Sequence, residues 1–498
     1  MIRDAARALL VGALALGFYV IAELRRDVIA AVVGNDAAPA AGPRFPTAEG
    51  AGLPPARAVR VVLVDGAGLD TSRAMPAWNA LCARGLDLTL DAGFPTVSLP
   101  VQLALWSGRT QQQTGVLFHS GKVVSPPLGT AGIPAQVPGS IAIAESHGYI
   151  VHSLGFADTR PPLAKQVPEG WPGRWVDEAT AAVAGPARLV FVHVLRLDTI
   201  GHRQGKASAA WTTTAAEADA ILARLIAAGP ADARWFVLSD HDHLAGGGHG
   251  SEHRAIRVVR ACLAGPGVRT GGGGPIHVTD LARAIADSVG ASLPADSPAR
   301  PLEAAIAAPV DDDDVLPRLP TDRVIAAWLL VLAAALATAW AARRPGRWWR
   351  TALALPWWWP VAIGSLVLLA GAPSLSTPMI YKPRGLDLIQ GFAPGLAVLA
   401  VALTLAAQTG WRRAVVAQLA LPAAGTLAVL IVTGGVSILW GGAPCPVVPL
   451  WTGWLSPLLL MASAASGVAA LVLLASAVLA ASGPSAPPGT RRSARAAP

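Results

Sequence analysis

The stretch VVLVDG at residues 61–66 is an apolar run that ends in a carboxylate and a glycine. Similar apolar runs recur and predict strands at 59–64, 149–154, 189–194, 235–238 and 256–263. Helical patterns alternate with them at 74–83, 140–146, 176–183, 207–228 and 280–289. This alternation predicts an α/β domain over 58–310, with a mainly parallel sheet sandwiched by helices. Functional residues of such sheets gather beyond the carboxyl ends of strands, where Asp65, Asp198 and Asp240 are found.

Four further motifs carry polar side chains: FPTVSLP (94–100), RLDTIGH (196–202), LSDHDH (238–243) and GGHG (247–250). Together with the first motif they supply the candidate metal ligands Asp65, Thr96, Asp198, His202, Asp240, His241 and His249. Three carboxylates and three imidazoles suit two divalent cations, most naturally zinc. Two such ions carry roughly +4 against −3 from the aspartates, which leaves positive charge to receive a phosphoryl group.

Each motif alone has a simpler explanation. Asp65 could cap a helix, and the Asp198–His202 spacing occurs often by chance. Asp240 and His241 are more specific, because adjacent donors at the end of a strand can turn toward one cleft. His249 lies among glycines that let the backbone approach an ion. All five motifs between residues 61 and 250 favour a two-metal site.

The set resembles the alkaline phosphatase superfamily, and within it the type I phosphodiesterase and GPI ethanolamine-phosphate transferase branch. PTVSLPVQLALWSG (95–108) is similar to the nucleophile segment of those transferases, and HVLRLDTIGHRQG (193–205) to their second metal-ligand segment. DHDHLAGGGHG (240–250) follows the spacing of their DHG…HG segment. HVTDLARAIADSVGASLP (277–294) resembles the helix near the end of the catalytic domain.

The resemblance implies a role for each ligand. One metal would be held by Asp65, Thr96, Asp240 and His241, and the other by Asp198, His202 and His249. Thr96 would be the nucleophile of a phospho-threonine intermediate, since coordination by a metal lowers the pKa of its hydroxyl. Ser98 is the nearest competing hydroxyl; Thr96 is preferred because it follows Phe-Pro before an expected helix, whose N-terminal amides favour an anion.

The chain departs from the family pattern in two places. Asp242 replaces the usual glycine after Asp-His, where it could crowd the site or add a ligand, and Val101 replaces an asparagine typical of nucleotide phosphodiesterases. His243 and His253 lie near the cluster and are expected outside the ligand set. The nucleophile segment lacks Cys-x-Pro-x-Arg, which argues against a formylglycine sulfatase.

The last third of the sequence predicts a five-helix transmembrane domain at 324–481. Apolar stretches near 325–341, 351–371, 389–408, 414–434 and 454–480 are each long enough to span a bilayer. Eleven of the 17 tryptophans follow residue 324, several beside the ends of these stretches, as in an interfacial aromatic belt. A re-entrant segment near 436–452 is an open alternative.

The N-terminal residues 1–23 predict a signal anchor, because no clear cleavage site follows the apolar run. Arginines at 343–350, 412–413 and in the basic tail 482–498 then place both termini in the cytoplasm and the catalytic domain outside the cell membrane. Linkers are expected at 24–57, rich in Ala, Pro and Gly, and at 311–323, which is acidic. The spacing of Asp311–Asp314 does not fit an EF-hand.

Cysteines and charge add two further expectations. Cys82, Cys262 and Cys445 do not form a disulfide framework; the first two are expected as small buried residues, although an outward compartment would permit a pair. The net charge of +8 comes largely from arginines flanking the apolar stretches and favours anionic lipid over nucleic acid.

The sequence therefore predicts a membrane-anchored, two-metal phosphodiesterase or phosphoethanolamine-type transferase that acts on phosphodiesters, with lipid-linked substrates and membrane lipids as partners. One alternative is a nucleotide pyrophosphatase/phosphodiesterase that transfers to water. The other is a membrane scaffold whose catalytic domain no longer reacts. Substrate, acceptor and oligomeric state leave no readable pattern.

Overall fold

Strand β1 (Ala58–Val64) lies near the middle of an eight-stranded sheet. The computed structural model describes residues 50–116, 132–163, 168–250 and 254–311, and the single positions 8, 9, 12, 15, 16, 45 and 315. Parallel neighbours of β1 are β5 (Leu189–Val194) and β6 (Ala233–Leu238). The remaining strands are β2 (Gly85–Asp91), β3 (Ile141–Ala144), β4 (Asp158–Arg160), β7 (Val258–Ala264) and β8 (Gly271–His277).

The sheet order is β4-β3-β5-β1-β6-β7-β2-β8, and β7 runs antiparallel to both of its neighbours. All other pairings in the sheet are parallel. The mainly parallel α/β sheet that the sequence predicts is therefore confirmed, with one antiparallel strand inserted. The carboxyl ends of β1, β5 and β6 consequently lie at one edge of the sheet.

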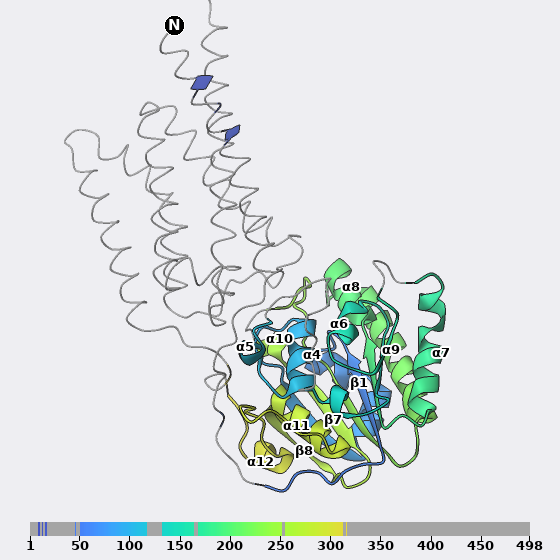
Figure 1. Cartoon of the computed structure of the whole chain (residues 1–498). Coiled ribbons are helices and arrows are strands. Elements are labelled where there is room, and N and C mark those ends of the chain that lie inside the picture. The colour runs from blue at the N-terminus through green and yellow to red at the C-terminus, as the bar shows by residue number, and fades with distance from the viewer. Residues whose placement is uncertain are drawn as a thin grey trace, which may run out of the picture.

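Helices cover both faces of the sheet (Figure 1). They are α2 (Leu69–Arg73), α3 (Pro76–Cys82), α4 (Ser98–Ser107), α5 (Gln111–Thr114), α6 (Tyr149–His152), α7 (Trp171–Ala184), α8 (Arg196–Gln204), α9 (Ala209–Ala228), α10 (Arg254–Arg257), α11 (Val278–Val289) and α12 (Leu302–Ala307), with a 3₁₀ turn, η2 (Pro134–Gln136). One core includes residues of α4 and α11, and the other includes residues of α3, α7 and α9.

Alternation along β1 divides its side chains between these two cores. Val61 and Leu63 lie in the core with α4 and α11, whereas Val62 and Val64 lie in the core with α3, α7 and α9. A strand that is buried on both faces consists of consecutive apolar residues, and for this reason the run VVLV at 61–64 predicted a central strand. The exception is buried Arg60, whose guanidinium donates to four backbone carbonyls, including that of Val183 at 2.7 Å.

Two predicted elements have the opposite secondary structure. The helix expected at 140–146 is strand β3, because Ile141–Ala144 pairs between β4 and β5, and this pairing overrides the helix propensity of its alanines. The strand expected at 149–154 begins as helix α6, and Ile150 and Val151 of this helix lie in one core together with Leu154 of the following turn.

Two other boundaries shift. The helix expected at 74–83 is interrupted before Pro76, which begins α3 because proline fits the first turn of a helix. The strand expected at 256–263 begins two residues later, since Arg254–Arg257 forms the short helix α10.

Cys82 and Cys262 form a disulfide between α3 and β7. Their Cα atoms are 5.2 Å apart, and both side chains are buried. The expected burial is confirmed, and the pair that an outward compartment would permit is formed. The sequence did not predict this pair, because position in a helix and a strand pattern says nothing about which two cysteines meet. The bond ties residues 180 positions apart in the sequence.

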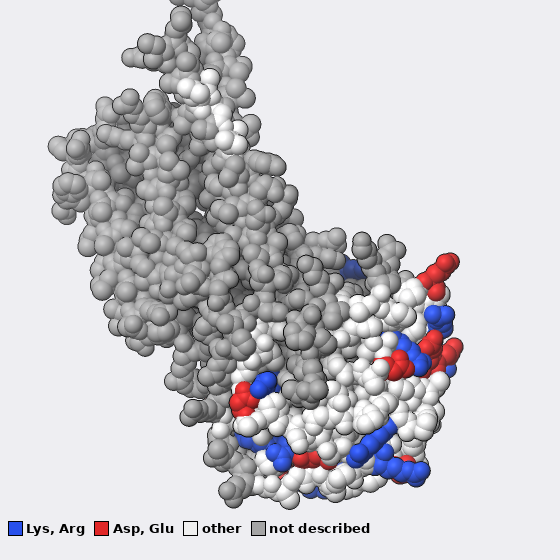
Figure 2. Space-filling model, viewed as in Figure 1, with Lys and Arg blue, Asp and Glu red and all other residues white. Residues whose placement is uncertain are grey.

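Charged side chains of both signs lie beside one another on the face shown in Figure 2. Arg269 and Glu303, both about half exposed, form an ion pair at 2.7 Å. Pairs so exposed to water contribute about 0–1 kcal/mol each.

Among the described residues, no helix has the length and apolar character needed to cross a membrane. The transmembrane domain predicted at 324–481, the basic tail at 482–498 and most of the signal anchor at 1–23 lie outside the described residues. These segments therefore remain predictions from the sequence.

Candidate metal centre

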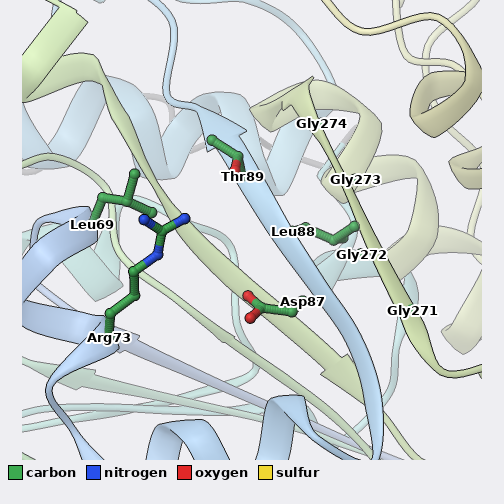
Figure 3. Close-up of a pocket in the computed structure, with 9 residues that line it drawn as sticks. All are labelled: Leu69, Arg73, Asp87, Leu88, Thr89, Gly271, Gly272, Gly273 and Gly274. Carbon is green, nitrogen blue, oxygen red and sulfur yellow. The ribbon is translucent and has the colours of Figure 1, made fainter.

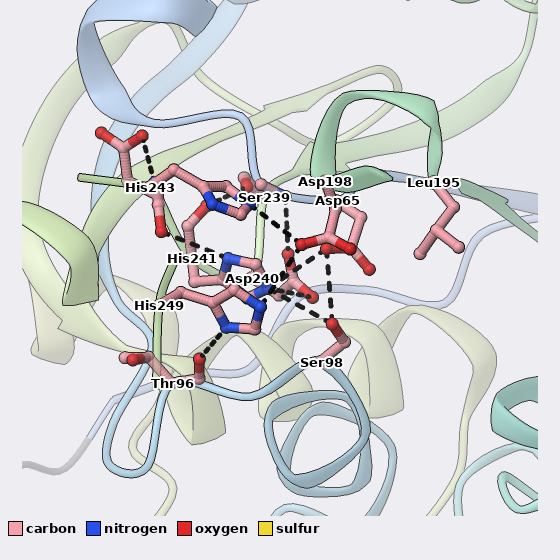
Figure 4. Close-up of polar contacts among 12 residues, drawn as sticks. Asp65, Thr96, Ser98, Leu195, Asp198, Ser239, Asp240, His241, His243 and His249 are labelled. Carbon is pink, nitrogen blue, oxygen red and sulfur yellow. Dashed lines mark hydrogen bonds and ion pairs between the residues drawn. The ribbon is translucent and has the colours of Figure 1, made fainter. Parts of the chain in front are cut away.

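The three predicted aspartates come together where β1, β5 and β6 end. Asp65 and Asp240 follow β1 and β6 directly or within two residues, and Asp198 lies in the first turn of α8, just after β5. All three side chains are buried. Two groups of candidate ligands form around them (Figure 4).

The first group consists of Asp65, Asp240 and His241. The Nε2 atom of His241 lies 3.2 Å from Asp65 Oδ1 and 3.7 Å from Asp240 Oδ2. The backbone N–H of Gly66 donates to the other oxygen of Asp240 at 3.2 Å, which fixes the direction of that carboxylate.

The second group consists of Asp198, His202, His243 and His249. The Nε2 atoms of the three histidines lie 3.2, 2.9 and 3.3 Å, respectively, from Asp198 Oδ1. Helix α8 brings Asp198 and His202 to one face because they are four residues apart. The loop after β6 carries the other two.

The two groups are neighbours. The ring of His241 stacks on that of His249 with centroids 3.6 Å apart and an angle of 8° between their planes. All six predicted Asp and His ligands therefore belong to one continuous cluster of two groups, in which His202 is partly exposed and the other five are buried.

The two candidate hydroxyls occupy different environments. Ser98 Oγ lies 3.4 Å from Asp65 Oδ1 and 3.2 Å from His241 Nε2, so it belongs to the first group. The Oγ1 atom of Thr96 accepts the backbone N–H of Gly250 at 3.0 Å. Ser98 is also the first residue of α4, the helix that the sequence predicted after Thr96. These contacts bring the Ser98 hydroxyl to the carboxylate and imidazole of the first group.

Burial, neighbouring charges and hydrogen bonds together shift the pKa values of the first group. Burial, helped by the charge of Asp65, raises the pKa of Asp240 to about 7. Burial opposes charge on His241, but the charges of Asp240 and Asp65 and a hydrogen bond to Asp65 outweigh it and raise the pKa of His241 to about 10. Burial also acts to raise the pKa of Asp65; hydrogen bonds from His193 and His241 overcome it and lower that pKa. In the absence of a metal, a protonated imidazole compensates the buried carboxylates.

The second group behaves differently. Burial lowers the pKa of His249 to about 3, and the charge of His241 acts in the same direction. Burial opposes ionisation of Asp198, yet hydrogen bonds from His202 and His243 hold its pKa well below the ordinary value. This group therefore combines an ionised carboxylate with a neutral imidazole, the forms that bind divalent metals.

The donors fit two divalent cations. Among the described residues, Asp240 Oδ2 has no hydrogen-bond partner although it is buried, which leaves a lone pair directed into the first group. In the second group, His249 Nδ1 donates to the carbonyl of Thr96 at 2.7 Å, so its Nε2 carries a lone pair. That atom lies 3.0 Å from His202 Nε2. An N/O donor set of this kind suits zinc.

Asp242 does not join either ligand group. Its carboxylate accepts from Lys206 Nζ at 2.5 Å, and Lys206 also contacts Asp70 at 2.6 Å. A Cβ on Gly68 would overlap this carboxylate, at 1.8 Å from one oxygen, so a glycine there makes room for it. The replacement of the family's glycine by Asp242 therefore adds an ion pair beside the site, without crowding the site.

Two buried histidines contact the ligands but were not selected from the sequence. His193 Nε2 lies 2.7 Å from Asp65 Oδ2, and His243 was expected outside the ligand set although its ring belongs to the second group. His193 is the next-to-last residue of β5 and lies in register with Leu63 of β1. A histidine so near the carboxyl end of a buried strand could have been selected from the sequence. His253 lies outside the described residues.

An open pocket of about 490 Å³ lies elsewhere, on β2 and β8. Figure 3 shows its lining, which includes Arg73, Asp87 and the glycines at 271–274. None of its lining residues belongs to the two ligand groups.

Comparison with known proteins bears on the chemistry. Residues 151–261 match the family model of the type I phosphodiesterases and nucleotide pyrophosphatases. The match confirms the predicted resemblance to type I phosphodiesterases over this segment, which includes Asp198, His202, Asp240, His241 and His249. It supports a phosphodiesterase-type enzyme of phosphoryl transfer. No curated protein matches the chain.

Solved structures show similarity at low sequence identity. Murine ectonucleotide pyrophosphatase/phosphodiesterase 5 is 14% identical, with 48% of this chain and 96% of that chain covered and a TM-score of 0.38. An alkaline phosphatase superfamily protein from Vibrio parahaemolyticus is 13% identical, with coverages of 58% and 79% and a TM-score of 0.37. A phosphonate monoester hydrolase from Silicibacter pomeroyi is also 13% identical, with coverages of 51% and 78% and a TM-score of 0.37.

Proposed function

We propose that this chain is a two-metal phosphotransfer enzyme that cleaves phosphodiesters through a covalent intermediate on Ser98. The observation that carries the proposal is the position of the Ser98 hydroxyl, which contacts both Asp65 and His241 of the first ligand group. The family match over 151–261 supports the reaction class.

The protein residues would divide the work between binding and attack. Asp65, Asp240 and His241 would hold one divalent cation, and Asp198, His202 and His249 the other. When bound, two such cations supply positive charge for the phosphoryl oxygens and lower the pKa of a coordinated hydroxyl. The N-terminus of α4 adds amide N–H groups to the same position, which favours an anion beside Ser98.

The proposed reaction has two displacements. Ser98 Oγ attacks phosphorus, an Oγ–P bond forms, and the ester oxygen leaves as an alcohol with the proton that the serine hydroxyl gives up. A water molecule or a second alcohol then attacks the same phosphorus and breaks the Oγ–P bond, which restores the serine hydroxyl. Thr96 would contribute through its backbone carbonyl, which accepts from His249, and through its contact with Gly250.

We also propose that the enzyme is membrane-anchored, that its catalytic domain faces outward, and that its diester substrate is lipid-linked. The apolar stretches of the sequence at 325–480 support the membrane part of this proposal. The disulfide between Cys82 and Cys262 supports the outward compartment, because disulfides persist in oxidising environments.

The first experiment uses the full-length protein in detergent with zinc, assayed on a bis-aryl phosphate and on an aryl monophosphate. Ser98→Ala should lower diester cleavage by about 10³-fold or more, while Thr96→Val, a variant of similar size, keeps a measurable rate. Rapid quenching followed by peptide mass spectrometry should find phosphate on Ser98. Phosphate on Thr96, or full activity of Ser98→Ala, would refute the assignment.

A second assay separates transfer from hydrolysis. Turnover of a vesicle-borne phospholipid diester with an added primary alcohol should yield the alkyl phosphodiester if the enzyme is a transferase. Release to water alone would favour the nucleotide pyrophosphatase-like hydrolase.

A further inference from the structure

His243 and His249 differ in the hydrogen bond that their Nδ1 atom makes: one accepts there and the other donates. His249 and His243 both point Nε2 at Asp198 Oδ1, at 3.3 and 2.9 Å. Distance alone therefore makes both of them candidate ligands of the second group. The partner of each Nδ1 atom distinguishes them.

His249 has the tautomer of a metal ligand. Its Nδ1 lies 2.7 Å from the backbone carbonyl of Thr96, which can only accept a hydrogen bond. Nδ1 must therefore carry the proton, and Nε2 keeps its lone pair. The Nδ1 atom of His241 in the first group also faces a backbone carbonyl, that of Asp242 at 3.4 Å.

His243 has the reverse pattern. Its Nδ1 lies 2.9 Å from the backbone N–H of Gly248, which can only donate. Nδ1 must therefore accept, and in a neutral ring the proton is on Nε2. A doubly protonated ring would direct a second N–H against the amide of Gly248. The Nε2–H of His243 consequently donates to Asp198 Oδ1 and has no lone pair for a cation.

Two glycines, Gly201 and Gly66, leave the space that the His243 ring occupies. A Cβ added to Gly201 would lie 2.6 Å from His243 Nε2, and one added to Gly66 would lie 3.1 Å from its Cδ2. Gly201 is in α8 between Asp198 and His202, so the helix that carries two ligands also leaves the space for this ring. The ring is wholly buried and packs edge-on to Trp211, with centroids 5.5 Å apart.

We infer that His243 is a positioning residue that holds the Asp198 carboxylate by donating Nε2–H to it, and that it is not itself a metal ligand. The inference rests on the proposed function, since it takes Asp198, His202 and His249 as the ligands of the second cation. It assigns a role to the histidine that follows Asp242, the residue at which this chain departs from the family pattern.

The test uses the full-length protein in detergent and measures zinc by chelator competition. His243→Ala should keep two zinc equivalents but bind one of them about 10–100-fold more weakly, as expected when the hydrogen-bonding partner of a metal ligand is lost. His243→Gln should recover much of this affinity, because its amide can still donate to Asp198. His249→Ala, the matched ligand variant, should lose one equivalent. X-ray absorption should give the same number of imidazole ligands for wild type and His243→Gln.

Three outcomes would overturn the inference: loss of one equivalent in His243→Ala, loss of an imidazole from the absorption spectrum of His243→Gln, or unchanged zinc affinity in His243→Ala. A melting measurement at saturating zinc checks that each variant is folded. If His243→Ala does not fold, His243→Gln still tests the inference. Failure of the proposed function has a different signature. Wild-type protein that binds two zinc ions yet cleaves no diester would refute the activity, and the affinities of the variants would still decide the role of His243.

Discussion

The Nε2 atoms of His202 and His249 face each other at 3.0 Å, in a partly buried contact beside the ionised carboxylate of Asp198. His249 presents a lone pair there, because its proton is committed to the carbonyl of Thr96. A neutral His202 can satisfy that lone pair only by donating its own proton. A divalent cation would accept both nitrogens and the carboxylate, and several predictions about metal binding depend on this relationship.

Zinc should bind at two equivalents per chain, and single substitutions should remove one equivalent each. Asp240→Asn is expected to lose the ion of the first group, because the carboxylate oxygen without a partner becomes a weak amide ligand. His202→Ala is expected to lose the ion of the second group. Metal analysis after desalting measures both losses. Unchanged content in both variants would show that these residues are not the ligands.

Metal-free protein should lose stability as the pH rises from about 6.5 to about 10. The pKa of His241 is about 10 in the folded protein, against about 6.5 in an unfolded chain. The stabilisation is complete below the unfolded value and disappears as the pH passes the folded value. Asp240, with its pKa raised to about 7, acts in the same direction at lower pH, since its ionised form is disfavoured by burial.

Thermal unfolding of chelated and zinc-loaded protein across this pH range checks the prediction. The melting temperature of the chelated form should fall with pH, and zinc should flatten the curve because it binds the deprotonated imidazole. His241→Gln should show a weaker dependence than wild type without metal. A melting temperature that rises with pH in the chelated protein would contradict the assignment.

Gly201→Ala should weaken zinc binding without touching any proposed ligand. Its new Cβ would lie within 2.7 Å of three atoms of the His243 ring, which must then move from Asp198. Gly173→Ala in α7 is the matched control, since nothing lies within 4 Å of a Cβ there. The control should be neutral or stabilising by about 0.4–1 kcal/mol. Equal zinc affinities for the two variants would argue against the close packing at Gly201.

Protein extracted from its host without reductant should contain one reactive thiol per denatured chain, and three after reduction. The sequence has three cysteines, and the disulfide uses Cys82 and Cys262. Alkylation followed by mass spectrometry gives the count. The Cys82→Ala/Cys262→Ala double variant should lose about 2–5 kcal/mol of unfolding free energy. Three free thiols before reduction would contradict both the bond and the proposed outward location.

The sequence predicted the central sheet well because its strands are buried on both faces. Strand β5 has the predicted bounds, and β1 and β6 differ only at their first residues. Strand β8 was missed because four glycines and a proline carry no strand signal. Local sequence also failed at 140–154, where an expected helix is strand β3 and an expected strand begins as helix α6. Pairing of β3 with β4 and β5 determines the secondary structure of this short segment.

The ligand groups were predictable because metal chemistry restricts residue types, and carboxyl ends of parallel strands converge. The role that we propose for Ser98 was not predictable in this way. It depends on the direction in which the start of α4 turns this hydroxyl, toward Asp65 and His241. The role of His243 likewise depends on a backbone N–H whose direction only the folded loop determines.

The loop after β6 has a consequence for the order of events during synthesis. Within the described residues, both ligand groups include side chains from 240–249, the last segment of the centre to leave the ribosome. The two metal sites that we propose would therefore be complete only after residues 240–249 have been synthesised. The relevant metal supply would be that of the compartment in which the domain folds.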